Sequence, residues 1–345
     1  MKKILLGSLI LVATGAIAQQ ADMSLIPYRQ GDKWGYATPD KKVVIAPKYN
    51  EANWFSEGYA SVKVGNKYGY INKVGKLVIP AKFTVAKSFR KGYVPNVKKV
   101  GGDSVLFAGA SLVASGVEIC INTKGSTMPK CPAINENSVL ENRAPLKTVT
   151  IEKTYSIPNN RGLFDKIVDD YKIPGSEETY YVAIKNNLYG VFNSKFDTII
   201  PFQYTSIKVN RKAAPYLEVN NAGMYGLLST DGKTMIAPEY SNLVTIDGPG
   251  GKEYIIIRKG GKTYVKDITN KDIISTGYAD IIYDDAGFII TGDNNMRGYY
   301  FNDNTIIQPK YQEVKWVNGT KYLIVKTSSG KVGYINSAGD EYFAE

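Results

Sequence analysis

Polar and apolar residues alternate along most of the chain in short runs that are separated by turn-forming residues. Residues 33–37 (Lys-Trp-Gly-Tyr-Ala) and 67–72 (Lys-Tyr-Gly-Tyr-Ile-Asn) are two such runs, and the second is followed by Lys-Val-Gly-Lys, which has turn chemistry. A later turn has the sequence Thr-Asp-Gly-Lys at residues 230–233. The runs lack the period of an amphipathic helix. The pattern therefore predicts short β-strands joined by tight turns.

The runs belong to a repeat that returns along the chain. A glycine at the centre of the first run marks each copy, and where neighbouring copies both keep it, the glycines are 34, 36 or 35 residues apart. A period this constant is the signature of a repeat architecture. Glycine inside a strand marks a bulge or a close approach of another backbone. The marker glycines are Gly35, Gly69, Gly190, Gly226, Gly298 and Gly333.

Each copy is expected to contribute three antiparallel strands. The glycine-containing run is the first, and a Val-Ile-Pro segment is the second, which proline ends because it cannot donate to a central ladder. The following Lys-Tyr pair turns the chain, and a run such as Ala-Ser-Val-Lys-Val at residues 60–64 is the third. Three short strands cannot bury a core alone, so neighbouring copies must stack.

The sequence therefore predicts an all-β fold, an array of about seven to eight three-stranded antiparallel repeats stacked as a solenoid or superhelix. The alternative is a closed ring like a β-propeller, whose blades usually have four strands and ~40–45 residues. Along the chain we expect a signal peptide at 1–18 and two repeats at 19–100. A degenerate repeat with a polar, cysteine-containing insertion follows at 101–179, and further repeats, the last one truncated, fill 180–345.

The repeat resembles the WG-repeat (KWG-repeat) family of bacterial proteins, with its pattern G-K-W-G-Y-I-D followed by G-K-x-V-I-P-x-K-Y-D. The resemblance covers roughly residues 31–100 and 180–343. It implies a repeat architecture and does not tie the chain to one activity. The aromatic residue before the glycine varies between copies, which favours a packing role, with partner binding as the alternative. These aromatic residues are Trp34, Tyr68, Tyr189 and Tyr225.

The N-terminus has the anatomy of a secretory signal peptide. Lys2 and Lys3 precede an apolar run at 4–18, which ends in Ala16-Ile17-Ala18, a small-x-small cleavage pattern. The run is shorter than the ~20 residues that span a bilayer, and no later stretch is long and apolar enough. We therefore expect an exported protein, cleaved near Ala18, that is periplasmic, displayed on the outer surface or secreted and has no transmembrane segment after signal removal.

The chain has two cysteines, Cys120 and Cys131, and both lie in the insertion. In an exported protein an isolated pair this close in sequence predicts a disulfide. Closing so short a loop would stabilise the fold by about 3 kcal/mol on the chain-entropy model. The alternative is two unrelated thiols.

The absence of histidine excludes several kinds of catalysis. Without histidine there is no Ser-His-Asp or Cys-His arrangement and no histidine-ligated zinc. Adjacent carboxylates such as Asp169 and Asp170 point to opposite faces of a strand and are poor candidates for a shared acid–base site. We therefore expect no catalytic residues, no metal site and no cofactor. A hydrolase that assembles its two carboxylates from distant positions remains the alternative.

The formal charge of the chain is +11. Lysines recur in the repeats, at Lys33, Lys67 and Lys331 near the glycine, and at Lys48, Lys82 and Lys310 after the proline. If stacked copies align these lysines, they form basic stripes that suit an anionic glycan. If not, they solubilise the outer face and protect strand edges, which is the interpretation we favour. The basic residues are spread out, so nucleic acid is not an expected partner.

Together these observations predict a non-catalytic repeat protein of the cell envelope that binds or scaffolds a protein or an anionic glycan. The alternative is an envelope glycan hydrolase that uses dispersed carboxylates. The lack of histidine, of a nucleophile motif and of a metal constellation favours the first.

Overall fold

The computed structural model describes residues 24–96, 99–113, 116–134, 162–212, 214–284 and 286–344. The chain forms two compact units. The first comprises Met1–Ala144 and Lys315–Glu345, and the second comprises Pro145–Val314. The expected signal peptide lies outside the described residues.

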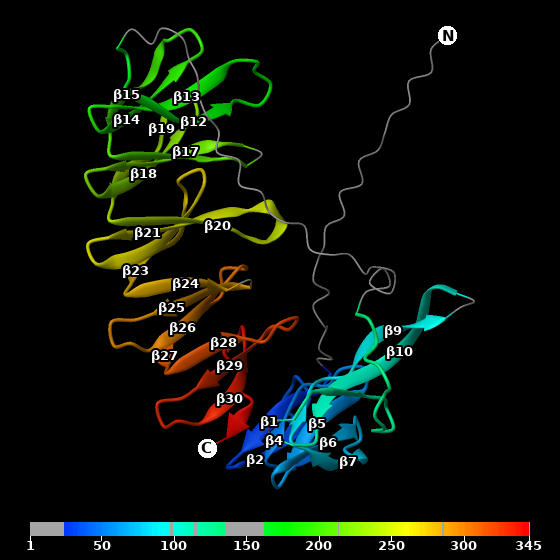
Figure 1. Cartoon of the computed structure of the whole chain (residues 1–345). Helices are drawn as coiled ribbons and strands as arrows, with labels where there is room; N and C mark the ends of the chain where they lie inside the picture. The colour runs from blue at the N-terminus through cyan, green and yellow to red at the C-terminus, as the bar shows by residue number, and fades with distance from the viewer. Residues whose placement is uncertain are drawn as a thin grey trace, which may run out of the picture. The chain divides into compact units, whose positions relative to one another are not determined.

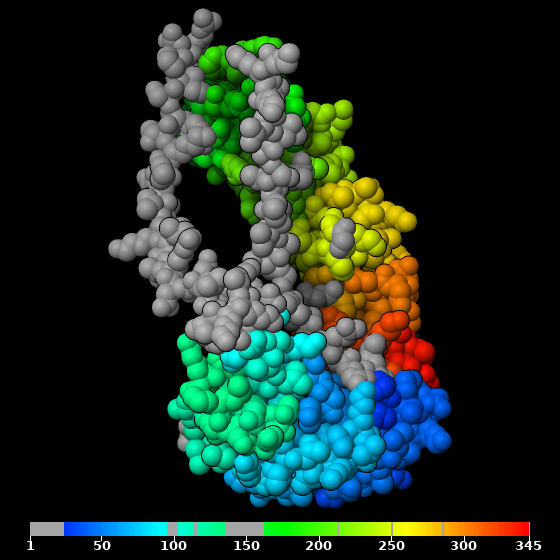
Figure 2. Space-filling model, turned by 90° about the vertical axis from the view of Figure 1, so that its right-hand side faces the viewer, coloured from blue at the N-terminus to red at the C-terminus, as the bar shows by residue number. Residues whose placement is uncertain are grey.

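The second unit contains four antiparallel sheets, each of four strands in sequential order. Figure 1 shows them as successive layers, and on the face shown in Figure 2 they follow one another from green to orange. The first two sheets are β12 (Lys166–Lys172), β13 (Thr179–Lys185), β14 (Leu188–Asn193) and β15 (Thr198–Tyr204), then β16 (Ser206–Asn210), β17 (Tyr216–Asn221), β18 (Met224–Ser229) and β19 (Thr234–Tyr240). The next two are β20 (Asn242–Asp247), β21 (Glu253–Lys259), β22 (Lys262–Asp267) and β23 (Asp272–Tyr278), then β24 (Asp280–Asp284), β25 (Gly287–Thr291), β26 (Arg297–Phe301) and β27 (Ile306–Tyr311).

The first unit is built from the same kind of sheet. One sheet contains β1 (Ile26–Gln30), β2 (Lys33–Ala37), β3 (Val43–Tyr49) and β31 (Phe343–Ala344), and the next contains β4 (Glu51–Ala52), β5 (Tyr59–Val64), β6 (Lys67–Asn72) and β7 (Leu77–Phe83). A third contains β8 (Val85–Ala86), β10 (Lys99–Ser111) and β11 (Ile119–Ile121), with β9 (Arg90–Asn96) paired to β10. A three-stranded sheet contains β28 (Glu313–Trp316), β29 (Tyr322–Lys326) and β30 (Val332–Asn336).

The described residues thus form eight sheets, as many as the repeat count predicts, and the fold is all-β. The prediction of three strands per repeat is wrong, because most sheets have four. In most sheets the missed strand is the first along the chain, whereas in the sheet of β1 it is β31. For example, a single residue, Thr205, separates β15 from β16. The Thr205 amide donates to the Asn220 carbonyl at 2.8 Å. The Lys-Tyr segment that we assigned to a turn therefore leads directly into another strand.

The prediction that proline ends the second strand is also wrong. Pro80 lies inside β7, and Pro47, Pro201, Pro238 and Pro309 lie inside the matching strands. In the sheets of the second unit, and in that of β7, this strand is at the edge of the sheet. An edge position tolerates the missing N–H of proline because no neighbouring strand needs it.

The proline segment explains the marker glycine. On β6 a single residue, Gly69, separates Tyr68 from Tyr70, whereas on β7 three residues separate their partners Phe83 and Ile79. The two extra residues of β7 form a bulge that crosses over Gly69. A Cβ atom at Gly69 would lie 2.5 Å from the Ile79 carbonyl oxygen, closer than any side chain allows. Gly35, Gly226 and Gly298 face the same backbone in their own sheets.

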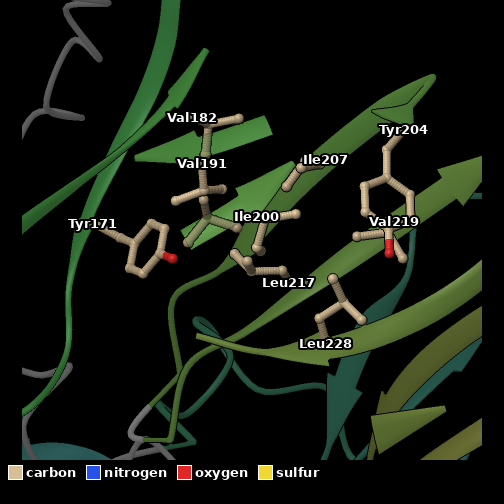
Figure 3. Close-up of a cluster of buried hydrophobic side chains, with 10 residues drawn as sticks. Tyr171, Val182, Val191, Ile200, Tyr204, Ile207, Leu217, Val219 and Leu228 are labelled. Carbon is tan, nitrogen blue, oxygen red and sulfur yellow. The ribbon is translucent and has the colours of Figure 1, made fainter. Parts of the chain in front are cut away.

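Successive sheets pack face to face, and their cores consist of aliphatic and tyrosine side chains. Figure 3 shows one such cluster, in which Val182, Val191 and Ile200 of one sheet meet Leu217 and Val219 of the next. The buried tyrosines satisfy their hydroxyls on main-chain carbonyls. Tyr36 donates to Asn53 at 2.7 Å, Tyr70 to Lys87 at 2.8 Å, and Tyr171 to Thr230 at 2.8 Å. Each of these three hydroxyls thus has the hydrogen-bond partner that a buried tyrosine needs.

A disulfide and a long-range strand pairing connect parts of the first unit. The predicted disulfide is present, and it joins Cys120 of β11 to Cys131 with their Cα atoms 5.2 Å apart. Strand β31 pairs in parallel with β1, so residues from the two ends of the described chain share one sheet. The Arg29 amide donates to the Tyr342 carbonyl at 3.2 Å.

Candidate functional site

The second unit contains a hollow of about 850 Å³. Its walls come from the β20–β21 connection, the β22–β23 turn, the β26–β27 turn and the segment between β16 and β17. Each contributes polar side chains, because turns and short connections carry the polar residues of a β-rich chain. The walls are formed mainly by Lys212, Asp247, Lys252, Glu253, Asp267, Thr269, Lys271, Asp272, Asn302 and Asn304.

Three aromatic side chains, Tyr254, Phe288 and Tyr300, line the hollow from the core between its two sheets. All three are buried, and the Phe288 ring lies edge-on to both tyrosines, with ring centres 5.2 and 6.4 Å away. The Tyr300 hydroxyl donates to the Ile273 carbonyl at 3.0 Å and lies 2.8 Å from Asn304 Oδ1. The hollow therefore has a rigid apolar lining beneath a polar rim.

One wall is a charged network around Lys212. The Lys212 ammonium donates to Asp247 at 2.6 Å and to Glu253 at 2.5 Å. Glu253 also accepts a hydrogen bond from the buried Tyr216 hydroxyl, which in turn accepts one from Asn210 at 2.7 Å. Partial burial lowers the pKa of Lys212, but the two carboxylates outweigh this, so its pKa is raised. Burial and the hydrogen bond to Glu253 raise the pKa of Tyr216. These groups form one connected hydrogen-bond network.

The opposite wall is the β22–β23 turn, which Asp267 organises. Its carboxylate accepts hydrogen bonds from the Thr269 amide and hydroxyl, at 2.9 and 2.7 Å, and from the Lys271 amide at 3.0 Å. Desolvation raises the pKa of Asp267, but these hydrogen bonds outweigh it and the pKa is lowered. Asp272 pairs with Lys266 at 2.7 Å. The Oδ1 atom of Asn302 is buried and has no hydrogen-bond partner among the described residues.

This arrangement suits binding better than acid catalysis. A general acid at neutral pH needs a carboxyl group with a raised pKa. Asp267 has a lowered pKa, and Asp247, Glu253 and Asp272 are each tied to a lysine. The charges lining the hollow nearly balance, with three lysines against four carboxylates. A ligand rich in hydroxyl or amide groups fits this chemistry better than a strong anion.

The aromatic residues predicted from the repeat lie elsewhere, at the start of one strand in each of four sheets. Trp34 packs between two core clusters, with Arg29 5.8 Å above its ring. The Tyr68 hydroxyl bonds to Glu51, and Lys63 lies 5.3 Å from its ring centre. Tyr189 packs against the cluster in Figure 3, and Tyr225 is 40% exposed. Trp34 and Tyr68 belong to the first unit, and Tyr189 and Tyr225 to the second.

Sequence reasoning missed the residues of the hollow. The two signals that mark it are the Gly-Pro-Gly-Gly run at 248–251 and the Asp-Ile-Thr-Asn-Lys-Asp run at 267–272. Both look like ordinary turns, and only the stacking of the sheets brings them to the same place. In the described ranges, no three Cys, Asp or Glu side chains are grouped so that they could hold a metal ion. No helix among the described residues is long and apolar enough to cross a membrane.

Comparisons with known proteins place the repeat in a family. The family model described as "WG containing repeat" matches residues 34–68, 68–99, 189–212 and 225–262. A comparison of the sequence with curated proteins gives no match.

Solved structures similar to this chain have low scores. The chain is 12% identical to virginiamycin B lyase from Staphylococcus aureus, with 92% of this chain and 96% of that one covered and a TM-score of 0.24. It is 10% identical to the Dos1 propeller, with 95% and 97% covered and a TM-score of 0.27. It is 12% identical to BBS1N in complex with ARL6DN, with 82% of this chain and 76% of that one covered and a TM-score of 0.22. These scores are too low for the likenesses to carry an argument.

Proposed function

Because the chain is a WG-repeat-containing protein, we propose that it is a non-catalytic binding module of the cell envelope and that the hollow of the second unit is its recognition site. The observation that carries this proposal is the hollow itself. A concave site with buried aromatic rings below and a few convergent polar groups above is the usual form of a small-ligand site. The ligand class that fits is the hydroxyl- and amide-bearing part of an envelope glycan.

The charge states of the lining residues support binding over hydrolysis. A glycosidase needs one carboxyl group that is protonated at neutral pH and a second that is ionised. Asp247 and Glu253 contact the Lys212 ammonium and Asp272 contacts that of Lys266, surroundings unlike the apolar pocket of a catalytic general acid. The alternative of an envelope glycan hydrolase therefore receives no support from this site.

Two observations support export. The first residues have the pattern of a signal peptide, the chain contains a disulfide, and disulfides persist in oxidising compartments. Cleavage near Ala18 and a periplasmic or outer-surface location belong to the same proposal. Within each unit, the face-to-face packing of successive sheets supports the stacked arrangement expected of a repeat array.

The test uses purified mature protein and a probe of defined composition. Soluble muropeptides released from peptidoglycan, and neutral oligosaccharides, are titrated against the protein by calorimetry. Lys271→Ala, at the rim of the hollow, is expected to weaken binding. Lys233→Ala is its matched control, because Lys233 ends the same turn in the preceding sheet but does not line the hollow.

Saturable binding that weakens in Lys271→Ala and not in Lys233→Ala would support the proposal. Equal affinity of the two variants would place the ligand elsewhere. Release of sugar products from the probes during the titration would overturn the non-catalytic assignment.

A further inference from the structure

The net positive charge of the chain comes from the first unit. The first unit contains 24 of the 43 lysines and arginines and 12 of the 32 aspartates and glutamates, a net charge of +12. The second unit contains 19 basic and 20 acidic residues, a net charge of −1. Solubility requires net charge but no such segregation, so lysines that only solubilise the surface do not explain it.

Matching repeat positions show the same difference. The residue before the aromatic position is Lys33 and Lys67 in the first unit, whereas in the second unit it is Leu188 or Met224. Where the second unit does keep a lysine there, Lys262, its charge is neutralised by Asp293. Because the strands and turns are otherwise alike, the backbone does not impose this lysine. It is retained where it is unpaired and replaced or neutralised elsewhere.

One group of basic residues in the first unit lies at one end of its sheets, whereas Lys41, Lys42, Lys73 and Lys76 lie in or beside turns at the other end. We call the end with the first group the turn face, and it is defined by the β1–β2, β5–β6 and β29–β30 turns. Two hydrogen bonds join the turn ends of neighbouring sheets. Arg29 donates to the Val332 carbonyl at 3.1 Å, and Asn50 accepts from the Gly65 amide at 3.0 Å. The basic residues of the turn face include Arg29, Lys33, Lys48, Lys63, Lys67 and Lys331, and its acidic residues are Asp32 and Glu51.

A third hydrogen bond, from the Lys67 ammonium to the Leu112 carbonyl at 3.4 Å, extends the turn face to the sheet that contains the disulfide. Arg29 is paired with Asp32, and Lys63 with Glu51. Lys33, Lys67 and Lys331 have no carboxylate partner in the described part of the chain. They stand one per sheet on three consecutive sheets, and packed sheets lie about 10 Å apart. The result is a row of three positive charges, one on each sheet.

From this row we infer that the turn face of the first unit binds an acidic polysaccharide. A linear polymer with a charge on every sugar can engage all three lysines at once, whereas a small anion can engage only one. Arg29 lies 5.8 Å from the centre of the Trp34 ring and Lys63 lies 5.3 Å from that of Tyr68, so cations and aromatic rings of the turn face lie together. The disulfide of the same unit favours an oxidising compartment, which argues against nucleic acid.

This site is separate from the hollow of the second unit, so the two are tested independently. The full mature protein, with its disulfide formed, is titrated with polygalacturonate, and dextran serves as the neutral control. Polygalacturonate is expected to bind and dextran is not. Affinity is expected to fall steeply as sodium chloride is raised, because exposed charges are screened by salt.

The decisive comparison is between two triple variants with the same loss of charge. Lys33→Gln, Lys67→Gln and Lys331→Gln together remove the row, and we expect about tenfold weaker binding with a shallower salt dependence. Lys166→Gln, Lys195→Gln and Lys310→Gln remove three exposed lysines of the second unit and serve as the control, with an expected change below about twofold. Equal melting temperatures would show that both variants fold.

Equal loss of affinity in the two triple variants would overturn the inference, because it would show attraction by net charge alone. Full affinity in the first triple variant would overturn it as well. Tighter binding of single-stranded DNA, or of vesicles containing anionic phospholipid, than of polygalacturonate would reject the assignment to polysaccharide.

Discussion

The Tyr342 hydroxyl donates a hydrogen bond of 2.8 Å to the carbonyl of Pro39, a residue 303 positions earlier in the chain. Tyr342 is fully buried and packs edge-on against Tyr322, with ring centres 5.4 Å apart. This contact and the β1–β31 pairing join residues 24–134 to residues 315–344 within the first unit. The segment at 340–344 therefore acts as a clasp.

Removing the Tyr342 ring should destabilise the first unit strongly. Tyr342→Ala is expected to lower the free energy of unfolding by about 3–5 kcal/mol, as for other buried aromatic residues. Tyr342→Phe should lose about 1 kcal/mol, the contribution of one hydrogen bond. Urea unfolding followed by fluorescence measures both. Tyr225→Ala, at an exposed position, should change stability by less than about 1 kcal/mol. A loss in Tyr225→Ala as large as in Tyr342→Ala would contradict the clasp.

Gly69→Ala should be among the most destabilising single-methyl changes in the chain. The added Cβ would meet the Ile79 carbonyl oxygen at 2.5 Å and the Ala81 nitrogen at 2.8 Å, and both are backbone atoms of a bulge that Pro80 stiffens. We expect a loss of several kcal/mol or failure to fold.

The matched control is Gly292→Ala, whose nearest contact is a side-chain atom, Asn294 Oδ1 at 3.1 Å, and not backbone. Thermal denaturation of the two variants tests the difference. If Gly69→Ala were no less stable than Gly292→Ala, the bulge would not be the reason for the glycine.

The disulfide should stabilise the first unit by about 3 kcal/mol, because it closes a short loop in the unfolded chain. Cys120 and Cys131 are 11 residues apart. Cys120→Ser with Cys131→Ser should lower the melting temperature, and a reductant should lower that of the native protein equally. A reductant should leave the double variant unchanged. Two free thiols in denatured, unreduced protein would show that the bridge does not form.

Asn302→Ala should weaken ligand binding in the hollow without lowering stability. Its buried Oδ1 atom has no partner among the described residues, so removing it relieves an unsatisfied polar group. If a ligand donor fills that position, affinity falls by about tenfold. Calorimetric titration and thermal melting measure the two effects. Unchanged affinity together with lower stability would mean that Asn302 is purely structural.

Alkaline pH should destabilise the first unit partly through Tyr68. Burial, together with the hydrogen bond to Glu51, raises the pKa of Tyr68 to about 12, whereas an unfolded tyrosine has a pKa near ~10. The folded state therefore holds the proton more tightly. Its contribution is complete below pH ~10 and is lost as the pH rises through about 12.

Urea unfolding at a series of alkaline pH values tests this. Tyr68→Phe has no proton to lose, so its stability should fall less steeply over the same pH range than that of the native protein. An identical slope in both proteins would exclude Tyr68 as a contributor.

The sequence by itself determined the all-β class, the repeat and the disulfide. These depend on local information, because the alternation of polar and apolar residues sets the strands and the spacing of the glycines sets the period. The sequence also placed Gly69 and its counterparts inside strands. The backbone that such a glycine contacts depends on strand pairing. The sequence predicted a strand end at Pro80, where the structure has a bulge.

Only the tertiary structure decided which distant segments meet. The opening strand of most four-stranded sheets lies in a segment that reads as a turn, and it becomes a strand because a neighbour pairs with it. Lys212 reaches Asp247 and Glu253 across two sheets, and Tyr342 reaches Pro39 across most of the chain. The row of Lys331, Lys33 and Lys67 likewise depends on contacts between neighbouring sheets of the first unit. Such contacts depend on stacking and closure, which no local pattern encodes.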